Sequence, residues 1–268
     1  LQKLRLGEED NDYFWDGVLS IEPSKIDPQT PGQRRLRNAK LFFEKKFGDM
    51  ANDDIARLAG EIQTKVLVLT YQVGSDLEAG LVFETINDRG KQLSSLDKIK
   101  NYLMYLASKT SSSSLSETVN ARWGELLRNI AQIEPELDDT EEEENSLARY
   151  HWIVETGDYR SYQIHREVKG KFKIGQSMVE ENAIRYVLGI AEASEPYLKI
   201  LHPNTRNLFR DIAGPVQEQV EYYLLCLSRL HTVANFAPML MSALKRFEDR
   251  PESFRDIASL CYLLAWRA

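Results

Sequence analysis

The chain has 268 residues, of which 43% are apolar and 10% aromatic, which is enough to build a substantial hydrophobic core. Its formal charge of −7 argues against a protein that coats nucleic acid non-specifically, because affinity for phosphate requires clustered lysine and arginine. Any contact with nucleic acid should therefore be local.

Helices are predicted in the first part of the chain over residues 10–19, 31–47 and 52–63, from the spacing of their apolar residues. The middle helix has the clearest ends. Thr30 followed by Pro31 is a typical N-cap and first helical residue, and Gly48 is a typical stop. We expect all three helices to contribute to the core.

The most convincing strand pattern covers residues 65–73, which are rich in β-branched residues and are bounded by Gly74 and Asp76. A weaker strand pattern lies at the start of the chain. Two strands cannot form a stable sheet alone, so they either pair with each other or lie at the edge of a larger sheet.

Beyond residue 76 the pattern is helical, and further helices are predicted over 76–87, 95–108, 115–133 and several segments from 145 to the end. We expect a boundary near residue 110, between an α/β-containing part (1–110) and an all-helical part (111–268). The predicted fold class is mainly α, a multi-helical array with a minor one- or two-strand element in the N-terminal third.

Aromatic and cysteine residues are expected to lie inside this array. Aromatic residues that stand among aliphatic ones at helical spacing, and are therefore assigned to the core, are Phe42, Phe43, Tyr222, Tyr223 and Trp266. Cys226 and Cys261 lie in apolar helical patterns, which indicates buried free thiols and a reducing, cytoplasmic compartment. We find no apolar run long enough to span a membrane and no signal peptide, so no membrane partner is expected. The absence of an initial Met and the helical pattern at the end indicate a piece of a longer protein.

The most distinctive stretch covers residues 80–108. It predicts a helix that ends near Gly90, which readily takes a positive φ, then a tight turn and a second helix that Ser94 and Asp97 open as a capping pair. The apolar stripe of the second helix consists of Leu96, Ile99, Leu103 and Leu106.

Cations gather where this second helix begins. Arg89 and Lys91 lie in the turn, and Lys98 and Lys100 lie off the apolar stripe. Such a cluster at a helix N-terminus can hold an anion such as phosphate. The alternative is a purely structural corner with solvated cations.

The same stretch resembles a hallmark Phe-x-x-x-Asn-x-x-Gly-x-x-Leu segment of the GmrSD-like family of modification-dependent (type IV) restriction proteins. The resemblance is carried by Phe83, Asn87, Arg89, Gly90, Leu93, Asp97, Lys98, Lys100 and Asn101. Weaker similarity in the same order covers residues 5–14 and 146–172. As a hypothesis, Asn87, Arg89, Gly90, Lys98, Lys100 and Asn101 bind a nucleotide or phosphate, whereas Phe83, Leu93 and Asp97 shape the corner.

The chemistry of that family lies in an N-terminal ParB-like portion with an Asp-Gly-Gln-Gln-Arg motif, associated with nucleotide hydrolysis, and in a C-terminal HNH-type nuclease. Residues 31–36 look similar to the first motif but lack its Asp, and we regard them as unrelated. The histidines are scattered over helical patterns, so no nuclease centre is predicted. We therefore expect no catalytic residue, metal site or cofactor in this chain; a nucleotide triphosphate and a divalent metal would act in the full-length parent.

A second candidate surface combines cations with Tyr150, Trp152, Tyr159 and Tyr162. Its cations, predicted to contact DNA, are Arg149, Arg160, Arg166, Lys169 and Lys171. Nucleic-acid grooves use this combination, because cations meet phosphates while rings stack on bases. In the alternative interpretation the rings are core and the cations line a wet face.

The predicted function is that of a fragment of a modification-dependent restriction or anti-phage defence protein. It would supply a scaffold and nucleotide or DNA contacts without a complete catalytic centre. The expected partners are modified DNA and the remaining domains of the parent or a partner subunit. The alternative is a catalytically inert helical interaction module. An independent enzyme would need converging acid, base or nucleophilic groups, which the sequence does not offer.

Overall fold

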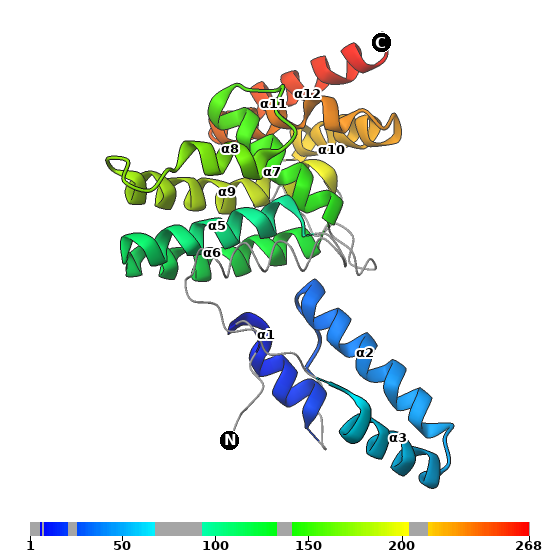
Figure 1. The fold of residues 1–268 in the computed structure, drawn as a ribbon. Helices are drawn as coiled ribbons and strands as arrows, with labels where there is room; N and C mark the ends of the chain where they lie inside the picture. The colour runs from blue at the N-terminus through cyan, green and yellow to red at the C-terminus, as the bar shows by residue number, and fades with distance from the viewer. Residues whose placement is uncertain are drawn as a thin grey trace. The chain divides into compact units, whose positions relative to one another are not determined.

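The computed structural model describes residues 6, 8–20, 26–67, 93–132, 141–203 and 214–267 (Figure 1). The regular structure of these residues is helical throughout, which confirms the predicted mainly α fold. The minor strand element is not supported within these ranges. Lys65 ends a helix, and Val66 and Leu67 have no regular structure; 68–73 and the first strand pattern, up to Arg5, lie outside the described residues.

Contacts divide the chain after Thr85 into two units. In the first unit the described elements are α1 (Glu8–Tyr13), the π-helix η1 (Phe14–Leu19), α2 (Pro31–Gly48) and α3 (Asn52–Lys65). In the second they are α5 (Ser95–Thr110), α6 (Ser113–Ala131), α7 (Glu141–Thr156), α8 (Ile164–Lys171), α9 (Val179–Leu201), α10 (Gly214–Arg229), α11 (Val233–Arg246) and α12 (Pro251–Ala265). The boundary expected near residue 110 falls between α5 and α6, which pack against each other inside the second unit.

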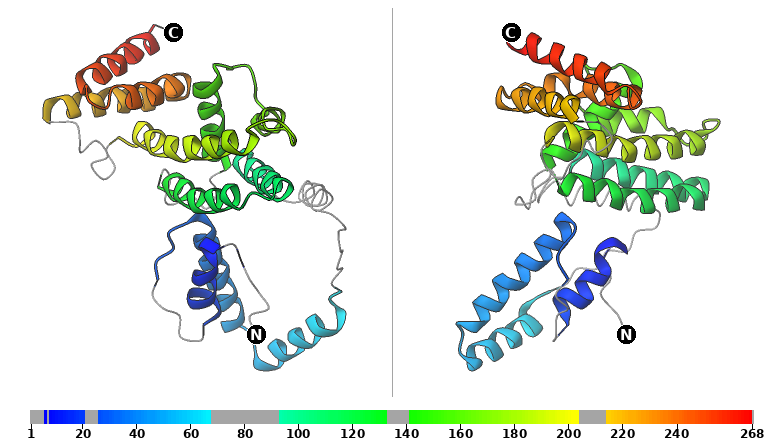
Figure 2. Two further views of the ribbon diagram at one scale, coloured as in Figure 1. Left: turned by 90° about the vertical axis from the view of Figure 1, so that its left-hand side faces the viewer. Right: turned by 180° about the vertical axis from the view of Figure 1, so that it is seen from behind.

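The second unit is layered around α9 (Figure 2). One side of α9 packs on α6, which in turn packs on α5, and α9 also contacts α7 and α11. Beyond α11 lies α12, which packs on α10. Trp123, Phe172 and Phe254 are the largest fully buried side chains, so the core runs through all these layers.

Local sequence signals place the helix starts. The Thr30 hydroxyl accepts a hydrogen bond from the amide of Gln33 (3.0 Å), and the Ser94 hydroxyl accepts one from the amide of Asp97 (3.0 Å). Both are the predicted N-caps, each satisfying an amide that the helix leaves without an acceptor. The predicted α5 stripe of Leu96, Ile99, Leu103 and Leu106 is completely buried.

Several predicted core residues are instead exposed. Phe42 (59%), Phe43 (52%), Tyr222 (56%) and Trp266 (66%) all show more than half of their surface, so their assignment to the core was wrong. Helical spacing identifies an apolar stripe but not whether another element covers it.

The two cysteines are free thiols, and they differ in burial. Cys261 is buried, as predicted, whereas Cys226 is half-buried. Burial raises the pKa of Cys261 to about 11, which makes this thiol unreactive at neutral pH. None of the helices that the structure describes has the length and apolarity to cross a membrane.

Candidate functional site

The first predicted site lies at the start of α5 and is only partly within the described residues. Phe83, Asn87, Arg89 and Gly90 lie outside them. The residues that can be placed are Leu93, Asp97, Lys98, Lys100 and Asn101, all of them half-buried. The described part of this site is therefore the N-terminal end of α5, and not the turn predicted before it.

Two amides at this helix end already have acceptors inside the protein. The Ser95 amide donates to Oδ1 of Asn145 at 2.6 Å, and the Asp97 amide donates to Ser94. An anion seated here would compete with both acceptors. Side chains two residues apart on a helix point roughly 160° away from each other, so Lys98 and Lys100 leave α5 on opposite sides. A single phosphate would consequently meet one of these lysines more readily than both.

Most residues of the second predicted site lie on α7, α8 and the segment between them, and together with Tyr102 of α5 we call them the cation–aromatic surface. Tyr150 instead packs on Tyr197, with ring centroids 5.8 Å apart, and Trp152 is buried. The cation–aromatic surface comprises Tyr102 of α5, Arg149 and Trp152 of α7, Tyr159, Arg160 and Tyr162 of the following segment, and Arg166, Lys169 and Lys171 of α8. Arg149 connects α7 to that segment. Its guanidinium lies 3.8 Å from the ring centroid of Tyr162 and donates to the carbonyl of Tyr159 at 3.2 Å.

Lysines of α8 join this surface to α7 and α5. Nζ of Lys171 lies 5.3 Å from the Trp152 ring centroid, and Nζ of Lys169 lies 5.9 Å from that of Tyr102. The Tyr102 hydroxyl also donates to the carbonyl of Phe172, at the end of α8. Three helices thus hold cations and rings in fixed proximity.

The surface continues along α5 through Lys98, which was predicted as part of the first site, and through Tyr105 and Lys109, which the sequence prediction missed. Lys98, Tyr102, Tyr105 and Lys109 follow one another at intervals of four, three and four residues and so share one side of the helix. Nζ of Lys109 lies 5.6 Å from the Tyr105 ring centroid. This spacing was visible in the sequence, but nothing there indicated that the side faces α8.

The surface keeps unneutralised positive charge. Among the described residues, no carboxylate forms an ion pair with Lys98, Lys109 or Lys171. Tyr159 and Tyr162 are 62% and 77% exposed, so their rings are accessible. The arrangement offers cations to phosphate and flat rings to bases.

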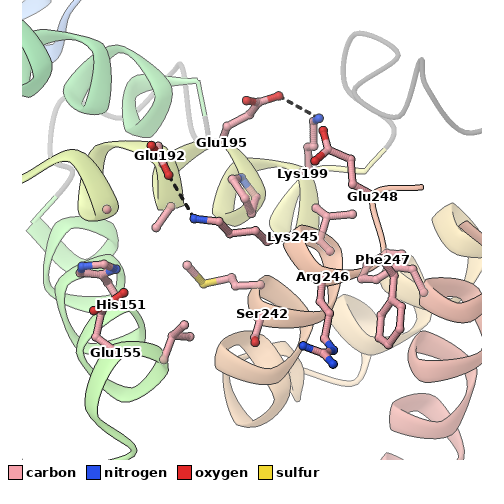
Figure 3. A pocket seen from close by; sticks show the side chains of 17 residues that line it. His151, Glu155, Glu192, Glu195, Lys199, Ser242, Lys245, Arg246, Phe247 and Glu248 are labelled. Carbon is pink, nitrogen blue, oxygen red and sulfur yellow. Dashed lines mark hydrogen bonds and ion pairs between the residues drawn. The ribbon is translucent and has the colours of Figure 1, made fainter. Parts of the chain in front are cut away.

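A separate pocket of about 650 Å³ opens between α7, α9 and α11 (Figure 3). Its lining contains apolar residues such as Val154, Met241 and Phe254 together with charged ones. Two ion pairs belong to this lining: Lys245 to Glu192 at 3.1 Å and Lys199 to Glu195 at 2.8 Å. Nothing in the sequence indicated this pocket, because α7, α9 and α11 are far apart along the chain.

His151 lies in the wall of the pocket and is 3% exposed. Burial, followed by the charges of Lys171 and Lys245, lowers its pKa to about 3. Its Nε2 is buried without a hydrogen-bond partner among the residues that the structure describes, and so is the hydroxyl of Tyr186, whose ring centroid lies 5.1 Å away. An imidazole of such low pKa is a weak general base at neutral pH.

Neither a metal site nor a similar protein narrows the function further. Within the described ranges, no group of three or more His, Cys, Asp or Glu residues is placed to hold a metal ion. Comparison with known proteins gives no match, since no family model, no curated protein and no solved structure is similar to this chain.

Proposed function

We propose that the chain is a DNA-binding module of a modification-dependent restriction or anti-phage defence protein, and that its cation–aromatic surface contacts the DNA. The observation that supports this proposal is the convergence of α5, α7 and α8, which gathers cations and aromatic rings, two of them exposed tyrosines, on one surface. In a chain of net charge −7 a surface of this kind is a local exception. Phosphate contacts through such a patch position a protein on DNA.

The assignment to a restriction protein rests on the resemblance of Phe83–Asn101 to the GmrSD-like segment. The parent would couple nucleotide hydrolysis to cleavage of modified DNA, and this chain would act as its scaffold and DNA contact. Asn87 and Arg89, which precede α5 in the sequence, and one of the two lysines of α5 would bind a nucleotide phosphate. Because Lys98 and Lys100 point apart, single alanine variants should separate their contributions in a calorimetric titration with GTP and ATP. If Arg89→Ala together with both lysine variants leaves nucleotide binding unchanged, this part of the proposal is wrong.

The DNA contact is tested by fluorescence anisotropy with a labelled duplex that carries cytosine, 5-methylcytosine or 5-hydroxymethylcytosine. The test variant is Arg160→Gln with Lys171→Gln. The control variant, Arg122→Gln with Lys245→Gln, removes the same charge from two ion-paired side chains elsewhere in the second unit. The test variant should bind about tenfold more weakly, and the slope of log affinity against log salt should fall by about 2. Equal losses in both variants would mean that only net charge matters, and the proposed surface would be wrong.

A catalytically inert interaction module is the second candidate, and one observation favours it. An apolar surface on α10 and α12 is formed by Tyr222, Leu260, Leu263 and Trp266, each more than half exposed. Exposed patches of this kind often mark protein interfaces. If Leu263→Lys abolishes restriction by the parent while the chain keeps its fold and DNA affinity, this apolar surface serves a protein partner.

A further inference from the structure

The most basic helix among the described elements lies in the first unit. α2 carries six cations, Arg34, Arg35, Arg37, Lys40, Lys45 and Lys46, against a single carboxylate, Glu44. The whole chain, in contrast, has 34 Lys and Arg against 41 Asp and Glu. This concentration of positive charge is local to α2 and involves none of the residues of the cation–aromatic surface.

One side of α2 is anchored to α1 and η1. The Thr30 hydroxyl, which caps α2, donates to Oδ1 of Asp10 at 2.9 Å, and Nζ of Lys40 donates to the carbonyl of Gly17 at 3.1 Å. Lys40 also pairs with Glu44 at 3.9 Å, so the single carboxylate of the helix lies on this anchored side.

A second side of α2 is basic and exposed. At 100° per residue, Arg35, Phe42, Lys45 and Lys46 fall within roughly 100° of arc, and Lys40 and Glu44 lie away from them. We call these four residues the α2 basic face. All four are exposed, and among the described residues none of the three cations forms an ion pair. Nζ of Lys46 lies 5.7 Å from the Phe42 ring centroid.

The position of Phe42 determines which anionic partner fits. A helix that binds a lipid surface carries its aromatic residues on an apolar side, opposite its cations. Phe42 is instead 59% exposed in the middle of the cations, at one end of a row of exposed rings that continues through Phe43 to Phe47. This arrangement matches a nucleic-acid single strand, whose unpaired bases stack on rings while its phosphates meet neighbouring cations. From Arg35 to Lys46 the face is roughly 16 Å long, enough for several successive phosphates.

We infer that the α2 basic face binds single-stranded nucleic acid. The inference does not rest on the proposed function, because the face and the cation–aromatic surface share no residue. It places a single-strand contact in the first unit of the chain.

The experiment measures binding of the whole chain to a fluorescent oligothymidine strand at low salt. Phe42→Ala should weaken binding about tenfold, since stacking one base on a ring contributes that much or more. Phe47→Ala is the matched control: it removes an exposed ring of the same helix (39%) that lies outside the face and is stacked on Phe43 rather than on Phe42. It should change affinity less than about twofold. Far-ultraviolet circular dichroism checks that both variants keep their helices.

The charges are tested with Lys45→Gln together with Lys46→Gln, for which we expect about tenfold weaker binding and a shallower salt dependence. The control is Arg57→Gln with Lys65→Gln, two exposed cations of α3 that are paired with Asp54 and Glu61. The test variant and its control are also measured in a chain that already carries Arg160→Gln and Lys171→Gln. This separates the contribution of the α2 basic face to strand binding from that of the cation–aromatic surface. A loss that persists there supports the α2 basic face even if the proposed DNA contact fails.

Three results would overturn the inference. The first is that the chain does not bind the oligothymidine strand. The second is that each test variant binds the strand as its control does. The third is that Phe42→Ala abolishes binding to vesicles of phosphatidylcholine and phosphatidylserine but leaves oligothymidine binding unchanged. The last outcome would make the α2 basic face a membrane-binding surface.

Discussion

Replacing Gly189 of α9 with alanine should destabilise the second unit, although alanine is normally the better helix residue. In a helix with open space the exchange stabilises by about 0.5–1 kcal/mol. A Cβ at Gly189, however, would lie 3.1 Å from Cε1 and 3.5 Å from Nε2 of His151. That ring is buried and packs on Tyr186, so it can give way only toward the pocket that it lines. Overpacking costs about 1–3 kcal/mol, which leaves a net loss of up to about 2.5 kcal/mol in the free energy of unfolding.

Urea unfolding followed by circular dichroism measures this change. Gly170→Ala on α8 is the control, because a Cβ there meets nothing within 4 Å and the exchange should be stabilising. In a His151→Ala background, Gly189→Ala should lose its penalty, and a double-mutant cycle isolates that coupling. Stabilisation by Gly189→Ala equal to that of the control would show that His151 does not pack against α9, and the described wall of the pocket would be wrong.

Three further predictions concern single side chains. The pKa of His151 is lowered from 6.5 to about 3, so between these values the unfolded chain binds a proton that the folded chain does not. Stability should therefore fall by about 2 kcal/mol from neutral pH to about pH 5, and an NMR titration that shows protonation of His151 near pH 6 would contradict this. Ser94→Ala should lower the free energy of unfolding by about 1 kcal/mol, because the amide of Asp97 loses its acceptor, whereas an aspartate in Ser94→Asp can still accept that hydrogen bond. Equal unfolding midpoints for the two variants would refute the cap. Tyr102→Phe should lower the free energy of unfolding by about 1 kcal/mol, because the hydroxyl no longer donates to the carbonyl of Phe172. Affinity for duplex DNA should not change, because the ring beside Lys169 stays. If the variant is as stable as the unmodified chain but binds duplex more weakly in the anisotropy assay, the hydroxyl contacts the DNA instead.

The elements that the sequence predicted well depend on local interactions. The caps at Thr30 and Ser94 are hydrogen bonds between residues three apart, and the α5 stripe repeats every three or four residues. Such features are complete within one helix, so composition and spacing are enough to identify them. The cations of the proposed DNA contact were predicted from residue type and spacing alone.

The sequence by itself therefore determined the helical fold class, the main helix ends and the buried side of α5. Only the tertiary structure decided which apolar stripes are covered: Phe42 and Trp266 carry a core-like pattern but remain exposed. It also decided which distant side chains meet, since Tyr102 contacts Phe172 across 70 residues and Gly189 makes room for His151. The physical reason is that burial and contact between helices depend on how whole elements pack, and the periodicity of one helix contains no information about its neighbour.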